Sequence, residues 1–152
     1  MPHIHDLIGF VVAAYITYGD KVLLVDHIKI KKWMPIGGHI ELDEDPDVAL
    51  VREIKEECGL EVEISGGLKP PDLTDSGTKP LLAPIYMDIH DITDTHKHIG
   101  LVYFAKATTD QVTLADKEHH AIRWFMKEDL ENPEFDIPPY VRFYAEQALL
   151  QK

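Results

Sequence analysis

Residues 38–60 read GHIELDEDPDVALVREIKEECGL and contain the clearest helix signal of the chain. Asp45 is a residue type that caps helix N-termini, and Pro46 suits the first helical position. Gly59 suits the C-terminal cap, where a left-handed backbone is common. We therefore expect a helix from about residue 46 to residue 58.

Three glutamates of this helix share one face, because Glu53, Glu56 and Glu57 stand at positions i, i+3 and i+4. The side chains predicted to face the core on the opposite arc are Val48, Val51, Ile54 and Cys58. Like charges at this spacing destabilise a helix by roughly 0.2–0.5 kcal/mol per pair. A hard cation such as Mg²⁺ would offset that repulsion. From the three glutamates alone, a solvated acidic face is the simpler interpretation.

The residues around these glutamates favour a bound cation over a solvated acidic face. Their order is Gly38, Glu44, Arg52-Glu53, Ile54, Glu56-Glu57, Gly59 and Leu60. With this spacing the segment resembles the Nudix box, and it covers about one-seventh of the chain. The resemblance implies a Nudix fold, an α+β architecture with an α/β/α sandwich around a central mixed β-sheet. It also implies a hydrolase that cleaves the pyrophosphate linkage of a nucleoside diphosphate joined to another moiety.

The resemblance assigns roles to box residues one at a time. Glu53, Glu56 and Glu57 would bind Mg²⁺, with Mn²⁺ as a substitute, and Gly38 would add its backbone carbonyl. Arg52 would orient a box glutamate through a charge-assisted hydrogen bond. The cations would bridge the phosphate oxygens of a small nucleotide-like substrate and activate the attacking water.

Further candidates for catalysis and substrate binding include residues outside the helix. The general base is left open between Glu53 and Glu118, and Glu118 precedes the strand expected at 122–125. Glu41 is a weaker candidate for a ligand or a substrate contact. Trp33 could stack on a nucleobase, although packing in the core is the simpler role for an aromatic residue.

Two histidines are candidates for the substrate cleft. His96 and His98 stand two residues apart and would share one face of a strand, where they could contact phosphate or base. With His119 and His120 they could instead meet as a zinc site, which is the less favoured interpretation.

Length and composition fit one globular domain over residues 1–152. The formal net charge of −12 argues against a nucleic-acid partner, which would require a basic surface. Cys58 is the single cysteine, which excludes an internal disulfide. The N-terminus lacks a secretory pattern, and the apolar run 7–16 is far shorter than the roughly 20 residues that span a bilayer. We therefore expect a cytoplasmic protein without a membrane partner.

Alternating apolar patterns and turn residues predict the remaining elements. The expected strands are 8–18, 21–26, 60–64, 81–89, 98–107 and 122–125. A helical turn is expected at 127–130, a terminal helix at 140–150, and a loop at 65–80 with three glycines and three prolines.

Two functional alternatives stay open. A Nudix-fold binding or sensor module without turnover would usually lack some box glutamates, and here all are present. The isomerases that resemble this fold need a cysteine ahead of the helix, whereas Cys58 lies within it. The sequence does not choose between a modified nucleoside triphosphate, a nucleotide sugar and another pyrophosphate as the substrate. The downstream proline or tyrosine that marks some family members is absent at its usual distance. Many such proteins form homodimers, so a homodimer is possible.

Overall fold

The computed structural model describes residues 7–115, 117 and 119–151. The strands are β1 (Ile8–Tyr18), β2 (Lys21–His27), β3 (Trp33–Met34), β4 (Ile36–His39), β5 (Val62–Ser65), β6 (Tyr86–Thr93), β7 (His96–Ala107) and β8 (His119–Met126). The helices are α1 (Pro46–Glu57), the 3₁₀ turn η1 (Thr74–Ser76), α2 (Lys127–Glu131) and α3 (Pro139–Leu149). Among the described residues, no helix is both long and apolar enough to cross a bilayer.

The strands form one mixed sheet with the order β3-β2-β1-β7-β5. β1 runs parallel to β7, whereas its pairings with β2 and β4 are antiparallel. β6 pairs with β7, and β8 pairs with β2. The two strands predicted at 8–18 and 21–26 form a hairpin, in which Tyr18 lies opposite Lys21 and Gly19 takes a φ of 62° in the turn.

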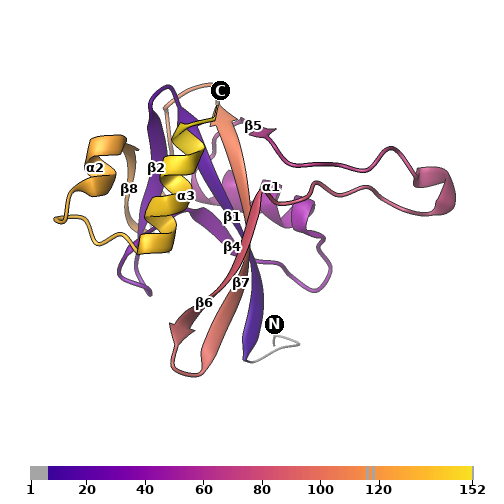
Figure 1. Cartoon of the computed structure of the whole chain (residues 1–152), viewed down its shortest axis with the longest axis horizontal. Coiled ribbons are helices and arrows are strands. Elements are labelled where there is room, and N and C mark those ends of the chain that lie inside the picture. Colours follow the sequence, from indigo (N-terminus) through magenta and orange to yellow (C-terminus); the bar gives the residue numbers. More distant parts are fainter. Residues whose placement is uncertain (1–6, 116, 118, 152) are drawn as a thin grey trace.

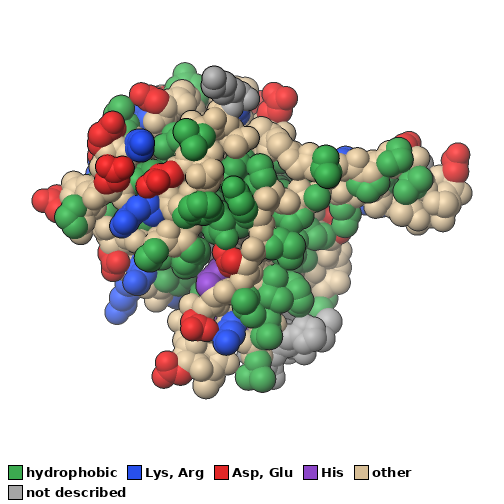
Figure 2. Space-filling model, viewed as in Figure 1, with side chains coloured by type: hydrophobic (Ala, Val, Ile, Leu, Met, Phe, Trp, Pro, Cys, Tyr) green, Lys and Arg blue, Asp and Glu red, His purple; other side chains and the backbone are tan. Residues whose placement is uncertain are grey.

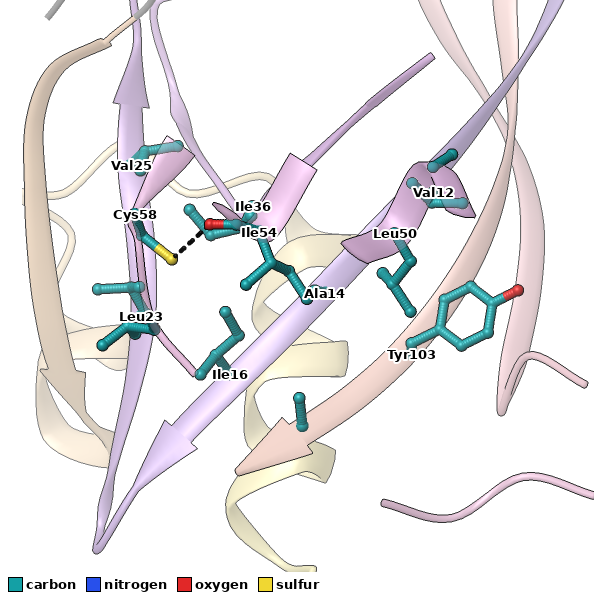
Figure 3. Packing of buried hydrophobic residues seen from close by; sticks show 13 residues of the cluster. Val12, Ala14, Ile16, Leu23, Val25, Ile36, Leu50, Ile54, Cys58 and Tyr103 are labelled. Atoms are coloured by element: carbon teal, nitrogen blue, oxygen red, sulfur yellow. Dashed lines mark hydrogen bonds between the residues drawn. The ribbon is translucent and has the colours of Figure 1, made fainter. Parts of the chain in front are cut away.

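Helices cover both faces of this sheet, which confirms the α/β/α sandwich (Figure 1). Alternate residues of a strand point to opposite faces, so β1 contributes to two separate cores. Val12 and Ala14 pack with Leu50 and Ile54 of α1, and Figure 3 shows this cluster. On the opposite face Tyr15 belongs to the core that includes residues of α2 and α3.

The predicted ends of α1 are confirmed to within one residue. Asp45 has an extended backbone, and its carboxylate accepts a hydrogen bond from the Val48 backbone N–H at 3.0 Å. Pro46 opens the helix, which ends at Glu57 with Cys58 as its C-cap. Gly59 follows with a φ of 67°, a left-handed conformation that glycine adopts without strain.

The predicted inward face of α1 is correct for Ile54 and Cys58, which are buried, and wrong for Val48 and Val51. Val48 and Val51 are 45% and 64% exposed. The buried residues of the helix are Ala49, Leu50, Glu53, Ile54 and Glu57. The helix is therefore rotated relative to the prediction, and two of its glutamates point inward. Polar partners stabilise these buried carboxylates. The periodicity of apolar residues alone could not predict this orientation.

The segment between β5 and β6 is longer than expected and projects from the body of the molecule (Figure 1). β6 begins at Tyr86 rather than at residue 81. Pro80 and Pro84 offer no backbone N–H for a strand ladder, which explains the late start. Leu68 in this segment is 82% exposed.

We predict that Asp45→Ala lowers the free energy of unfolding by about 1 kcal/mol at neutral pH, because the helix loses its cap. The Asp45 carboxylate also lies 2.6 Å from Lys79 Nζ. The hydrogen bonds from Lys79 and from the Val48 N–H lower the pKa of Asp45. The ionised Asp45 carboxylate therefore stabilises the protein at pH values above the pKa that Asp45 has in the unfolded chain. This stabilisation is lost as the pH falls through the lower pKa that Asp45 has in the folded protein.

Urea unfolding at neutral and acidic pH measures this effect. The difference between Asp45→Ala and the unchanged protein is expected to narrow in acid. Asp43→Ala, at an exposed position two residues earlier, is the matched control and should change stability little. Equal losses in the two variants would contradict the capping role.

Candidate active site

Two glycines of β4 bring the strand close to the helix that carries the glutamates. Gly37 and Gly38 pair with Ala13 and Val12 of β1. A Cβ atom at Gly37 would collide with the Val12 backbone oxygen, and one at Gly38 would collide with the Glu53 carboxylate. The paired glycines therefore allow the inward glutamates of α1 to contact the backbone of β4.

Glu57 is a buried carboxylate with polar partners on two strands. Its side chain is almost completely buried, and Oε1 accepts a hydrogen bond from the Gly37 N–H at 3.0 Å. Oε2 lies 2.5 Å from Nε2 of His119, which is buried on β8. These contacts fix the position of the carboxylate relative to β4.

Glu53 is also buried, with 8% of its surface exposed. Its Oε1 accepts a hydrogen bond from Arg52 Nη1 at 2.9 Å. Burial raises the pKa of Glu53 to about 8, and a hydrogen bond with Glu57 and the charge of Glu57 act in the same direction. Two carboxylates this close repel one another, and a proton or a cation between them relieves the repulsion.

Arg52 binds several groups around the start of the helix. Its Nε and Nη2 donate to the two carboxylate oxygens of Glu44, at 2.6 and 2.8 Å. Nη2 also donates to the His39 backbone carbonyl at 3.1 Å. Glu44 in turn accepts from the Glu41 N–H at 3.1 Å, so it connects the loop to the helix. Bidentate pairing of this kind fixes the guanidinium and, through it, Glu53.

Glu56 differs from the two buried glutamates, because 61% of its side chain is exposed. Its Oε2 lies 3.3 Å from Arg52 Nη1. Of the three glutamates, two are thus buried and one is open to solvent. Magnesium takes oxygen ligands and keeps several waters, so the residues present fit a Mg²⁺-type cation.

A cavity of about 140 Å³ lies between the sheet and α3, and none of the three box glutamates is among its lining residues. Its lining includes Gly37 and Gly38 of β4, Tyr15 of β1 and Tyr144 of α3. Histidine surface is visible near the middle of Figure 2, in a hollow bordered by hydrophobic and acidic side chains. Strand β4 therefore borders both the cavity and the box glutamates.

The polar wall of the cavity is built around Asp88. Its Oδ2 accepts a hydrogen bond from the Tyr144 hydroxyl at 2.5 Å, and its Oδ1 lies 2.6 Å from His90 Nδ1. The His90 ring stacks on Tyr140 with 4.5 Å between centroids. Burial, together with the hydrogen bond to Asp88, raises the pKa of Tyr144, so this hydroxyl stays a donor at neutral pH.

The remaining candidates are spread over several regions. Trp33 packs edge-on against Phe125 and Phe135, with 4.9 and 6.1 Å between centroids, in the core on the α3 side. Glu41 is exposed at the loop before α1. Glu118 lies outside the described residues.

The less favoured interpretation, in which His96 and His98 meet His119 and His120, does not match the structure. His96 and His98 meet His39 of β4, whereas His119 contacts Glu57 and His27. β8 pairs with β2, which carries His119 away from the start of β7. Sequence reasoning missed the pairing of His119 with Glu57, because only the long-range strand order places the two side chains together.

Known proteins resemble this chain in sequence and in fold. The chain matches the family model described as NUDIX domain over residues 8–147. It is 31% identical over 121 residues to the CTP pyrophosphohydrolase of Escherichia coli (strain K12). The aligned region covers 76% of this chain and 90% of that protein.

Solved structures give the same result. A hydrolase of the NUDIX family from Clostridium perfringens superposes with a TM-score of 0.80 and 38% identity, covering 93% of this chain and 95% of that one. The MutT NUDIX hydrolase from Burkholderia pseudomallei has a TM-score of 0.67 and 21% identity, covering 93% and 98%. The second likeness concerns the fold alone.

Proposed function

The chain belongs to the Nudix family of pyrophosphohydrolases, and we propose that it uses Mg²⁺ to hydrolyse a nucleoside triphosphate or a similar nucleotide. The observation that carries the proposal is the position of β4. Gly37 and Gly38 line the cavity, while the Gly37 N–H binds Glu57 and Gly38 packs against Glu53. A nucleotide whose base occupies the cavity can therefore present its phosphates to the box glutamates.

The cation would be held by Glu53, Glu56, Glu57 and the backbone carbonyl of Gly38, with Mn²⁺ as a substitute. When bound, the ion neutralises phosphate charge and acidifies the attacking water. Arg52 keeps Glu53 in place through the hydrogen bond at 2.9 Å and is itself fixed by Glu44. Glu53 and Glu118 remain the two candidates for the general base.

The cavity wall supports a base that carries an exocyclic amino group. An ionised carboxylate has about four acceptor positions, and the contacts with Tyr144 and His90 occupy two of them at Asp88. An amino group can donate to a remaining position. Cytosine has such a group, which agrees with the similarity to a protein named as a CTP pyrophosphohydrolase.

We predict that Asp88→Asn lowers kcat/KM for CTP at least about tenfold more than kcat/KM for UTP, a difference of roughly 1.4 kcal/mol. The amide keeps one acceptor oxygen but replaces the other with an NH₂ donor, so fewer acceptor positions remain for the amino group of cytosine. Steady-state assays of both nucleotides measure the ratio, which is insensitive to a general loss of folded protein. Asp91→Asn, at an exposed position of the same strand, is the matched control. An unchanged CTP/UTP ratio in Asp88→Asn would contradict the proposed recognition.

The activity itself is tested by a panel of nucleoside triphosphates, nucleotide sugars and dinucleoside polyphosphates, assayed with Mg²⁺ or Mn²⁺ in ¹⁸O-labelled water. We expect one ¹⁸O atom per cleaved phosphoanhydride, and mass spectrometry of the products identifies the phosphorus attacked. EDTA is expected to abolish the reaction. Nucleotide binding without cleavage of any substrate would contradict the proposal and favour a sensor module.

A further inference from the structure

A cluster of three histidines lies at the cavity wall. His39 ends β4, and His96 and His98 open β7. One ring nitrogen from each lies within 4.8 Å of those of the other two. All three side chains are partly buried. The box glutamates and the Asp88 contacts do not account for this convergence.

The register of the sheet creates the cluster. β1 pairs with β4 and with β7, so that His39 lies opposite Val11 and His98 lies opposite Gly9. A Cβ atom at Gly9 would stand 3.4 Å from both the His39 and His98 rings. The missing side chain at Gly9 thus leaves the space across which these two rings meet, with 4.8 Å between centroids. His96 joins them with the same centroid distance to His98, since residues two apart share a strand face.

We propose that His39, His96 and His98 form a binding site for a divalent transition metal of the Zn²⁺ class, separate from the carboxylate site. Neutral imidazole nitrogens suit zinc, cobalt, nickel and copper, whereas magnesium prefers oxygen. Three nitrogens around a tetrahedral ion at 2.0–2.1 Å stand roughly 3.4 Å apart. The rings would therefore close by about 1.4 Å from the present limit of 4.8 Å, which small side-chain rotations can supply.

The site would occupy a defined place in the molecule. His39 and His98 line the cavity, and His39 directly follows Gly38, the predicted carbonyl ligand of the other cation. Three protein ligands leave the fourth tetrahedral position for water or another oxygen. The cavity wall would thus hold a nitrogen-bound ion on the face of β4 opposite the glutamates, because neighbouring residues of a strand point to opposite faces.

The test is a titration of the full chain with Co²⁺ in the presence of excess Mg²⁺, which keeps the carboxylate site filled. Four-coordinate Co²⁺ absorbs visible light much more strongly than octahedral Co²⁺. We expect the strong bands to saturate at one equivalent and to disappear when Zn²⁺ is added. Weak bands of octahedral type alone would overturn the proposal.

Variants assign the signal to the three histidines. His96→Gln and His98→Gln are each expected to weaken Co²⁺ binding at least about tenfold, because each removes one ligand. His120→Gln, which changes an exposed histidine on β8, is the matched control and should bind as the unchanged protein does. Circular dichroism checks that each variant is folded. If a folded His96→Gln or His98→Gln variant kept full Co²⁺ affinity and the strong bands, the proposed site would be wrong.

The outcome is independent of the hydrolytic activity, because no substrate is present. Glu56→Gln should keep the Co²⁺ bands, since Glu56 belongs to the oxygen site. Loss of the bands in Glu56→Gln would place the ion at the carboxylates and overturn the proposal.

Discussion

Glu56→Gln is expected to lower Mg²⁺-dependent hydrolysis at least about a hundredfold, which corresponds to roughly 2.7 kcal/mol of transition-state stabilisation. Glu56 is the exposed member of the three box glutamates, and its Oε2 lies 3.3 Å from Arg52 Nη1. Its replacement removes a negative oxygen donor without opening a space in the core. Stability should therefore change by less than about 0.5 kcal/mol.

Steady-state kinetics over a range of Mg²⁺ concentrations, with urea unfolding in parallel, measure both effects. Glu61→Gln is the matched control, because it removes the same charge at an exposed position just beyond the helix. It should keep near-normal turnover. If Glu56→Gln were as active as Glu61→Gln at saturating Mg²⁺, the assignment of Glu56 as a ligand would be wrong.

Glu57→Gln is expected to reduce hydrolysis by at least the same hundredfold and also to destabilise the protein by about 1–3 kcal/mol. Glu57 is buried and connects α1 to the Gly37 N–H and to His119. Glutamine can still accept the hydrogen bond from Gly37, but it removes the negative charge beside His119. A ligand and a packing contact are therefore lost in one substitution.

The two effects are separated by assaying Glu57→Gln well below its own unfolding temperature, with activity expressed per folded molecule. Differential scanning calorimetry gives the unfolding temperature. Loss of stability with near-normal turnover would show that Glu57 supports the fold alone. A fall in turnover with unchanged stability would contradict its buried pairing.

Local chemistry made much of α1 predictable. Asp45, Pro46 and Gly59 act within a few residues of the helix ends, so these residues alone predict where the helix begins and ends. The turn at Gly19 is predictable for the same reason, because it depends on neighbouring residues in the sequence. The rotation of the helix was not predictable in this way, because Val51 is exposed while Glu57 is buried against partners on β4 and β8.

Long-range strand order explains the other differences. His39 and His98 are 59 positions apart in sequence and meet only because β4 and β7 both pair with β1. The sequence pattern placed His98 on a strand face but could not identify the residue opposite. Similarly, the contact of His119 with Glu57 depends on the pairing of β8 with β2.

In the proposed function, the glutamates of α1 hold the cation that binds the substrate phosphates. The most direct measurement is an anomalous difference map from crystals soaked with Mn²⁺ and a non-hydrolysable nucleoside triphosphate analogue. We predict a Mn²⁺ peak bonded to Glu56, Glu57 and the Gly38 carbonyl, with analogue phosphates on the same ion and the base in the cavity. A nucleotide bound with its phosphates away from these glutamates, and with no Mn²⁺ peak beside them, would contradict the account.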